Sequence, residues 1–98
     1  MCGRGTLNSE LSEAIAGSVR KLIASKTDAA LAAKGLARST PSAILGAASC
    51  EEQCEIEANA DITCLASLSA NGVIDSQCFL DGLDNITTNY EACLKACP

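Results

Sequence analysis

Six of the seven cysteines lie in the second half of the chain, and their spacing constrains the fold more than any other feature. The pattern is C-x3-C-x9-C-x13-C-x14-C-x3-C, with a C-x3-C pair at each end. Because positions four residues apart share one face of an α-helix, each C-x3-C pair predicts a helix that presents both thiols to one neighbour. The six positions are Cys50, Cys54, Cys64, Cys78, Cys93 and Cys97.

The first three and the last three cysteines each form one stripe on a helix. A helix turns by about 100° per residue, which places each trio within about 80° to 100°. Two antiparallel helices would join these stripes as nested disulfides. Six cysteines allow fifteen pairings, which the sequence alone does not separate, but the nested one matches both stripes in height. The nested pairs are Cys50–Cys97, Cys54–Cys93 and, by the turn, Cys64–Cys78.

The two arms of this hairpin differ in length. The inner and middle cysteines are ten residues apart in the first arm, about 15 Å, and fifteen apart in the second, about 22 Å. A disulfide needs Cα atoms within about 7 Å, so two straight helices cannot form both pairs. We therefore expect a break at residues 81–85, followed by a last helix with Thr88 and Glu91 as its cap.

A small core makes disulfides more plausible than metal ligation for these cysteines. The 98 residues include only two aromatic side chains and no histidine. Small domains with few large side chains in the core usually need covalent cross-links. Each disulfide typically contributes about 2–4 kcal/mol to the free energy of unfolding. Cysteine-only zinc sites generally use closer pairs, often C-x2-C. Disulfides imply an oxidising compartment. The seventh cysteine, Cys2, has no obvious partner in the hairpin and is expected to be a free thiol.

The first half of the chain is predicted to be helical. Thr27-Asp28 offers a cap for a second helix, which Gly35 would stop. The first helix has an apolar stripe at three- and four-residue spacing. The stripe consists of Leu7, Leu11, Ile15, Val19 and Leu22.

Later helix boundaries are marked by capping residues. A third start is predicted at residues 39–41, where a proline stands at the first helical position. That helix could continue to residue 70, or the chain could restart at Ser49, with Glu52 completing a capping box. Asn71-Gly72 ends the helix in either case.

Charge divides the chain into two segments. Residues 1–49 form an Ala-rich basic segment of net charge +3, and residues 50–98 form the acidic stapled hairpin, of net charge −8. The halves either attract each other or meet different partners, or the acidic face is simply solvated. Nucleic-acid binding is not expected, because the basic half has only a small net positive charge and no aromatic side chains that could stack on bases.

Residues 1–49 also resemble an organellar presequence in their Ala and Ser content, but three acidic residues and a well-capped first helix favour a retained segment. The longest apolar stretch is interrupted by Lys34 and Arg38, so no membrane span is predicted. The amphipathic first helix could contact a membrane peripherally, although such a stripe more often packs on a neighbouring helix.

No pattern of catalytic residues is present. Without histidine the chain can form neither a Ser-His-Asp nor a Cys-His arrangement, and it has no glycine-rich phosphate loop and no C-x-x-C motif. Asp81, Asp84 and Asn85 lack the spacing of an EF-hand loop. We expect a protein that is not an enzyme, without catalytic residues, cofactor or metal.

The cysteine pattern resembles two families of disulfide-linked helical hairpins over residues 50–97. Cys54-x9-Cys64 and Cys78-x14-Cys93 are similar to the twin CX9C (CHCH) proteins, with the second motif lengthened. The outer C-x3-C pairs are similar to the twin CX3C motif of the small Tim chaperones. Resemblance to CHCH proteins implies the mitochondrial intermembrane space and an accessory role in a respiratory complex.

Two functions follow as expectations. In the first, the protein is a structural accessory subunit or assembly factor of a larger, membrane-embedded, energy-converting complex. The hairpin would act as a rigid clip, in the mitochondrial intermembrane space or the thylakoid lumen. The alternative is a secreted, disulfide-rich effector such as a pheromone, toxin or antimicrobial, although net acidity counts against membrane lysis.

Overall fold

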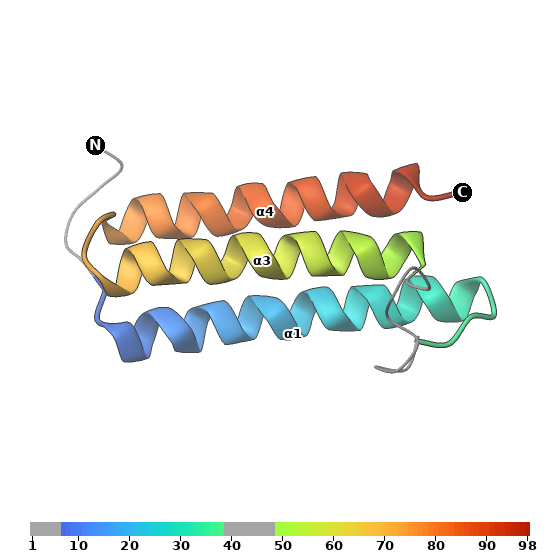
Figure 1. The fold of residues 1–98 in the computed structure, drawn as a ribbon, viewed down its shortest axis with the longest axis horizontal. Coiled ribbons are helices and arrows are strands. Elements are labelled where there is room, and N and C mark those ends of the chain that lie inside the picture. Colours follow the sequence, from blue (N-terminus) through green and yellow to red (C-terminus); the bar gives the residue numbers. More distant parts are fainter. Residues whose placement is uncertain (1–6, 39–48) are drawn as a thin grey trace.

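The computed structural model describes residues 7–38 and 49–98, and all secondary structure in these two ranges is helical. The helices are α1 (Ser9–Ala33), α3 (Cys50–Ala70) and α4 (Ser76–Ala96). They lie side by side and alternate in direction, so α3 and α4 form an antiparallel hairpin (Figure 1). Both α1 and α4 pack extensively on α3 and meet each other less. The all-α prediction and the predicted hairpin are confirmed.

Polar side chains set the starts of the helices. Ser49 and Glu52 form the predicted capping box, in which each side chain accepts the backbone N–H of the other residue. Asn8 caps α1 and Asp75 caps α4, each through a side-chain oxygen. These oxygens satisfy N–H groups that have no partner inside the helix.

Two glycines end α1 and α3 where the sequence predicts. Gly35 and Gly72 have φ angles of 69° and 72°, a left-handed conformation that glycine adopts without steric cost. The next backbone N–H in each case, from Leu36 and Val73, donates to a carbonyl five residues earlier at 2.9 Å. This geometry is a Schellman motif, and it satisfies carbonyls at the helix end.

The predicted helix start at Thr27 is wrong, because α1 runs through it without interruption. The Thr27 hydroxyl donates to the Ile23 carbonyl at 3.0 Å and also hydrogen-bonds the hydroxyl of Tyr90 on α4. Both groups are buried, and burial raises the pKa of the Tyr90 phenol. A threonine with these partners is accommodated inside a helix. The start predicted at residues 39–41 lies outside the described residues.

The predicted break at residues 81–85 is also wrong, because α4 is continuous from Ser76 to Ala96 and Thr88 lies inside it. Gly82 has a packing role instead. A Cβ atom added there would lie 2.6 Å from Leu65 Cδ2, so the glycine permits close approach of α3 and α4. The mistaken break followed from requiring all three disulfides to form between these helices.

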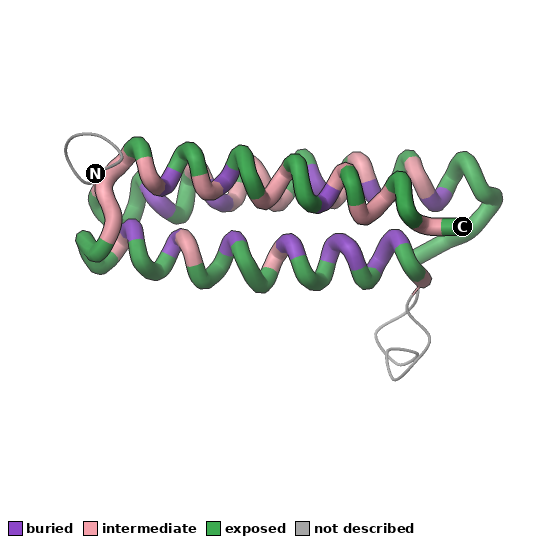
Figure 2. Tube along the Cα trace, turned by 90° about the horizontal axis from the view of Figure 1, so that it is seen from above, coloured by how far each residue is buried: buried purple, intermediate pink, exposed green. Residues whose placement is uncertain are grey.

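One core is shared by the three helices, so the basic and acidic segments pack together (Figure 2). Phe79 is its largest fully buried side chain, and two of the four residues that α3 contributes are alanines, which allow close helix packing. The buried cluster comprises Ala16, Ile23, Cys54, Ala58, Ile62, Ala66, Phe79, Leu83 and Tyr90.

The buried face of α1 is not centred on its predicted apolar stripe. Leu11 and Leu22 are 45% and 48% exposed, and the other stripe residues are half-buried at the edge of the core. Ser12 is fully buried, and its hydroxyl hydrogen-bonds Ser69 on α3 at 2.9 Å. The centre of the face is formed by Ser12, Ala16, Ile23, Thr27 and Leu31.

Candidate functional site

Two of the predicted disulfides join α3 to α4 at one end of the bundle. Cys50 pairs with Cys97 and Cys54 pairs with Cys93, with Cα–Cα distances of 5.7 and 5.8 Å. The bonds lie one helical turn apart, because both helices supply cysteines four residues apart. Cys97 lies just beyond the last residue of α4.

The predicted Cys64–Cys78 pair is not formed, since Cys64 is a free, exposed thiol. Cys78 takes part in a disulfide, but its partner is not Cys64. The register explains the error. In two continuous helices joined at Cys54 and Cys93, Cys78 is level with Ser69, which lies five residues, or about 7.5 Å, from Cys64. The predicted free thiol at Cys2 lies outside the described residues.

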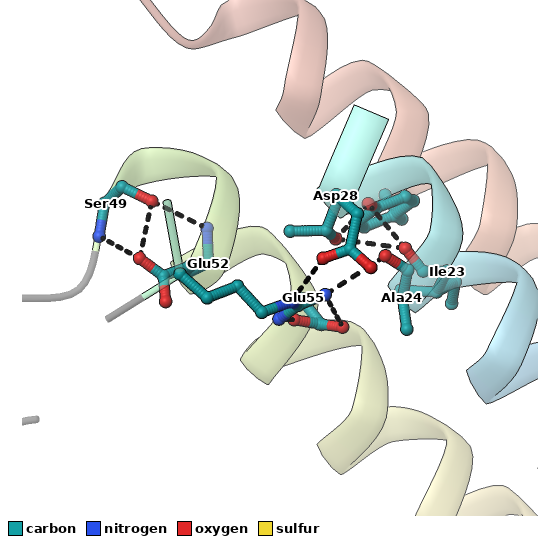
Figure 3. A network of polar contacts seen from close by, with 9 residues as sticks. Ile23, Ala24, Asp28, Ser49, Glu52 and Glu55 are labelled. Carbon is teal, nitrogen blue, oxygen red and sulfur yellow. Dashed lines mark hydrogen bonds and ion pairs between the residues drawn. The ribbon is translucent and has the colours of Figure 1, made fainter. Parts of the chain in front are cut away.

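Two basic residues after α1 clamp the start of α3. The Lys34 ammonium donates to the buried Glu51 carboxylate and to the Pro98 carbonyl oxygen. The Arg38 guanidinium donates to both carboxylate oxygens of Glu55 and to the carboxylate of Asp28. Figure 3 shows that two of these partners, Asp28 and Glu55, lie close to each other. The clamp therefore ties residues 34–38 to α1, α3 and the C-terminal residues.

The contacts of Lys34 and Arg38 shift the pKa values of groups that take part in them. The hydrogen bond from Lys34 holds the pKa of Glu51 below its usual range, and hydrogen bonding to Glu55 raises the pKa of Arg38. Attraction between the two halves is one of the three alternatives that their charge asymmetry left open. Sequence could not identify the partners, because residues 34–38 reach α3 only once the chain has turned after Gly35.

We expect Lys34→Met to lower the free energy of unfolding more at pH 7 than in acid. A lowered carboxyl pKa adds stability above its unfolded value of about 4.3, and that stability is lost as pH falls through the folded pKa. Urea unfolding at pH 7 and at about pH 2 measures the difference from wild type. Lys21→Met is the matched control, because Lys21 is an exposed lysine for which the described residues provide no ion pair. An equal loss at both pH values would contradict the assignment.

The seam between α1 and α4 carries exposed aliphatic side chains. An ion pair of 2.9 Å between Lys26 and Glu91 shows which sides of α1 and α4 meet. Leu22 lies one turn before Lys26, and Leu80 lies eleven residues, or three turns, before Glu91, so both leucines border the seam. Leu11 lies three turns before Leu22 on the same side of α1.

We call this surface the α1/α4 face and define it by three exposed and two half-buried side chains. Leu11, Leu22 and Leu80 are 45%, 48% and 46% exposed, and Ile15 and Leu94 are half-buried beside them. Towards the cysteine end the seam opens into a shallow groove of about 330 Å³. The groove is lined by Lys26, Ala29, Glu91, Leu94 and Lys95.

The described residues offer few groups for chemistry. Within residues 7–38 and 49–98, the one close group of potential metal ligands is Cys50, Cys54 and Cys97, whose sulfurs are engaged in disulfides. In the same ranges no helix is both long and apolar enough to cross a membrane. The prominent features are therefore the paired disulfides and the α1/α4 face. Searches against protein-family models, curated proteins and solved structures found no match to the chain.

Proposed function

We propose that the protein is a non-catalytic accessory subunit or assembly factor that docks on a larger protein complex through the α1/α4 face. The observation that carries this proposal is the exposure of Leu11, Leu22 and Leu80 along one seam. Single exposed leucines are ordinary, but several gathered on one face are typical of an interaction surface.

Rigidity supports the same function. The α1/α4 face is built on helices held at one end by two disulfides and by the clamp of Lys34 and Arg38. A surface that is already ordered loses little conformational entropy on binding, so more of the contact energy appears as affinity.

The partner that fits this surface is an amphipathic helix of the larger complex. A helix in the seam would complete a four-helix bundle and cover the leucines. Lys26 on the α1 side of the seam is paired with Glu91 on the α4 side, which also carries Asp84 and Lys95. A partner helix with an apolar stripe would cover the leucines, and its polar flanks would meet these mixed charges. The CHCH-like cysteine pattern supports a membrane-embedded, energy-converting complex as the host.

The test is a charge substitution on the α1/α4 face. We expect native tagged protein from its source to elute with a complex far larger than its own 10.0 kDa. The double variant Leu22→Glu/Leu80→Glu should elute free, because losing two buried leucines costs about 3 kcal/mol or more, roughly a hundredfold in affinity. Size-exclusion chromatography of the extract, with circular dichroism to confirm folding, measures this.

Ile56→Glu is the matched control. Ile56 is 53% exposed on α3, away from the seam, and its substitution should leave the complex intact. Equal loss of the complex in both variants would argue against the α1/α4 face. Wild-type protein that is found free in the culture medium and is active by itself would overturn the accessory role in favour of a secreted effector.

A further inference from the structure

The two disulfides between α3 and α4 touch each other. Cys54 Sγ lies 3.8 Å from Cys97 Sγ, which belongs to the other bond. The Sγ atoms of Cys50, Cys54 and Cys97 all lie within 4.8 Å of one another. A thiolate formed at Cys97 would therefore be in van der Waals contact with a sulfur of the inner disulfide.

The outer and inner bonds differ in their access to solvent. In the outer bond Cys50 is exposed and Cys97 is half-buried, whereas in the inner bond Cys93 is half-buried and Cys54 is only 2% exposed. A thiol in solution therefore meets the outer disulfide first, at Cys50. Because an exchange reaction needs an accessible sulfur, direct attack on Cys54 is disfavoured.

The backbone at Cys97 permits its sulfur to move. Cys97 follows Ala96, the last residue of α4, and has an extended backbone with φ −69° and ψ 133°. A shift toward Cys54 therefore requires no distortion of the helix. A new bond requires the two sulfurs to close from 3.8 Å to about 2.05 Å, with the Cα atoms within about 7 Å.

A cation lies beside the outer disulfide. The Lys34 ammonium donates hydrogen bonds to the two residues that follow the cysteines of this disulfide. They are Glu51, which accepts through its carboxylate, and Pro98, which accepts through its carbonyl oxygen. A nearby ammonium group stabilises a thiolate and so favours its departure from a disulfide. The same lysine pairs with Glu51, the carboxylate adjacent in sequence to Cys50, which reduces the repulsion of a thiolate by that group.

We propose that the paired disulfides form a thiol–disulfide exchange site for small monothiols of the glutathione class. The incoming thiolate attacks Cys50 Sγ, forms a mixed disulfide there and releases Cys97 as a thiolate. The Cys97 thiolate then attacks Cys54 Sγ, forms a Cys54–Cys97 bond and releases Cys93 as a thiolate. Each step exchanges one S–S bond for another, with no net gain or loss of electrons. This activity is separate from docking through the α1/α4 face.

The test maps bonds after exposure to glutathione. The free thiol of Cys64 is first blocked by alkylation, so that it cannot take part. Reduced glutathione is added, the reaction is stopped with acid, new thiols are alkylated with a second reagent, and peptides are identified by mass spectrometry. We expect glutathione on Cys50, a Cys54–Cys97 bond and the second label on Cys93. Label on Cys97 with the Cys54–Cys93 bond intact would overturn the proposal, as would no uptake of glutathione.

A variant tests the internal step alone. Cys50→Ser leaves Cys97 without its partner, and we expect purified protein to contain the Cys54–Cys97 bond with a free Cys93. Cys64→Ser, with both disulfides retained, is the matched control and should keep the original pairs. A folded Cys50→Ser protein with only the Cys54–Cys93 bond would contradict the internal step. If circular dichroism shows that this variant is unfolded, the wild-type glutathione experiment decides.

Discussion

Loss of the inner disulfide is expected to be among the most destabilising changes in this protein. Cys54 and Cys93 close a chain segment with a sequence separation of 39. Because the outer Cys50–Cys97 bond already encloses this segment, the inner bond further constrains only the short stretches between the two bonds. This contributes about 2.5 kcal/mol in the chain-entropy model, a large part of the roughly 5–15 kcal/mol that holds a domain folded. The Cys54→Ser/Cys93→Ser variant should therefore lower the melting temperature by roughly 10–20 °C.

Thermal unfolding followed by circular dichroism measures the stability that the variant loses. The same measurement on wild-type protein reduced with a phosphine tests all of the disulfides together. Reduction also breaks the outer bond and the disulfide of Cys78, so it should melt the hairpin further. Cys64→Ser is the control and should leave the melting temperature unchanged, because Cys64 is free and exposed. Full helicity and an unchanged melting temperature in reductant would show that packing of α1, rather than the disulfides, holds the fold.

Phe79→Ala is expected to reduce the free energy of unfolding by about 3–5 kcal/mol. Phe79 is fully buried where α4 begins, in a core that contains many alanines. The only other aromatic side chain, Tyr90, is three turns away and fixed by its hydrogen bonds to α1. A close-packed core relaxes only in part around a deleted ring, so we expect most of the cavity to persist.

The adjacent residue provides a matched control for this prediction. Leu80 is 46% exposed, and Leu80→Ala should cost less than about 1 kcal/mol. Urea unfolding of both variants, followed by circular dichroism, gives the two free energies. Equal losses would show that Phe79 is not at the centre of the core and that the packing of α4 is different.

Features that depend on a few neighbouring residues were predictable from the sequence. The capping box of Ser49 and Glu52 and the helix ends at Gly35 and Gly72 are local, because each is decided by hydrogen bonds within one or two turns. The C-x3-C pairs were equally predictable, since four-residue spacing places two thiols on one face wherever a helix forms.

Errors arose where a prediction depended on register between helices. The nested pattern required Cys64 and Cys78 to meet, and that requirement produced the false break at residues 81–85. Two disulfides near one end leave α4 free to continue as a straight helix. Gly82 then serves the contact with Leu65 instead of a turn. Glycine in a helix has this ambiguity, because only the neighbouring helix shows whether the missing side chain is needed for packing.

The sequence by itself determined the all-helical class, the capping box at Ser49, the helix ends at Gly35 and Gly72 and the shared face of each C-x3-C pair, since these follow from local hydrogen bonding and helical periodicity. Only the tertiary structure decided which side of α1 is buried. Ser12 and Thr27 lie in the core because Ser69 and Tyr90 satisfy their hydroxyls there. Leu11 and Leu22 remain exposed in consequence. Hydrophobicity alone could not predict this arrangement, because burial of a hydroxyl depends on a partner from a distant part of the chain.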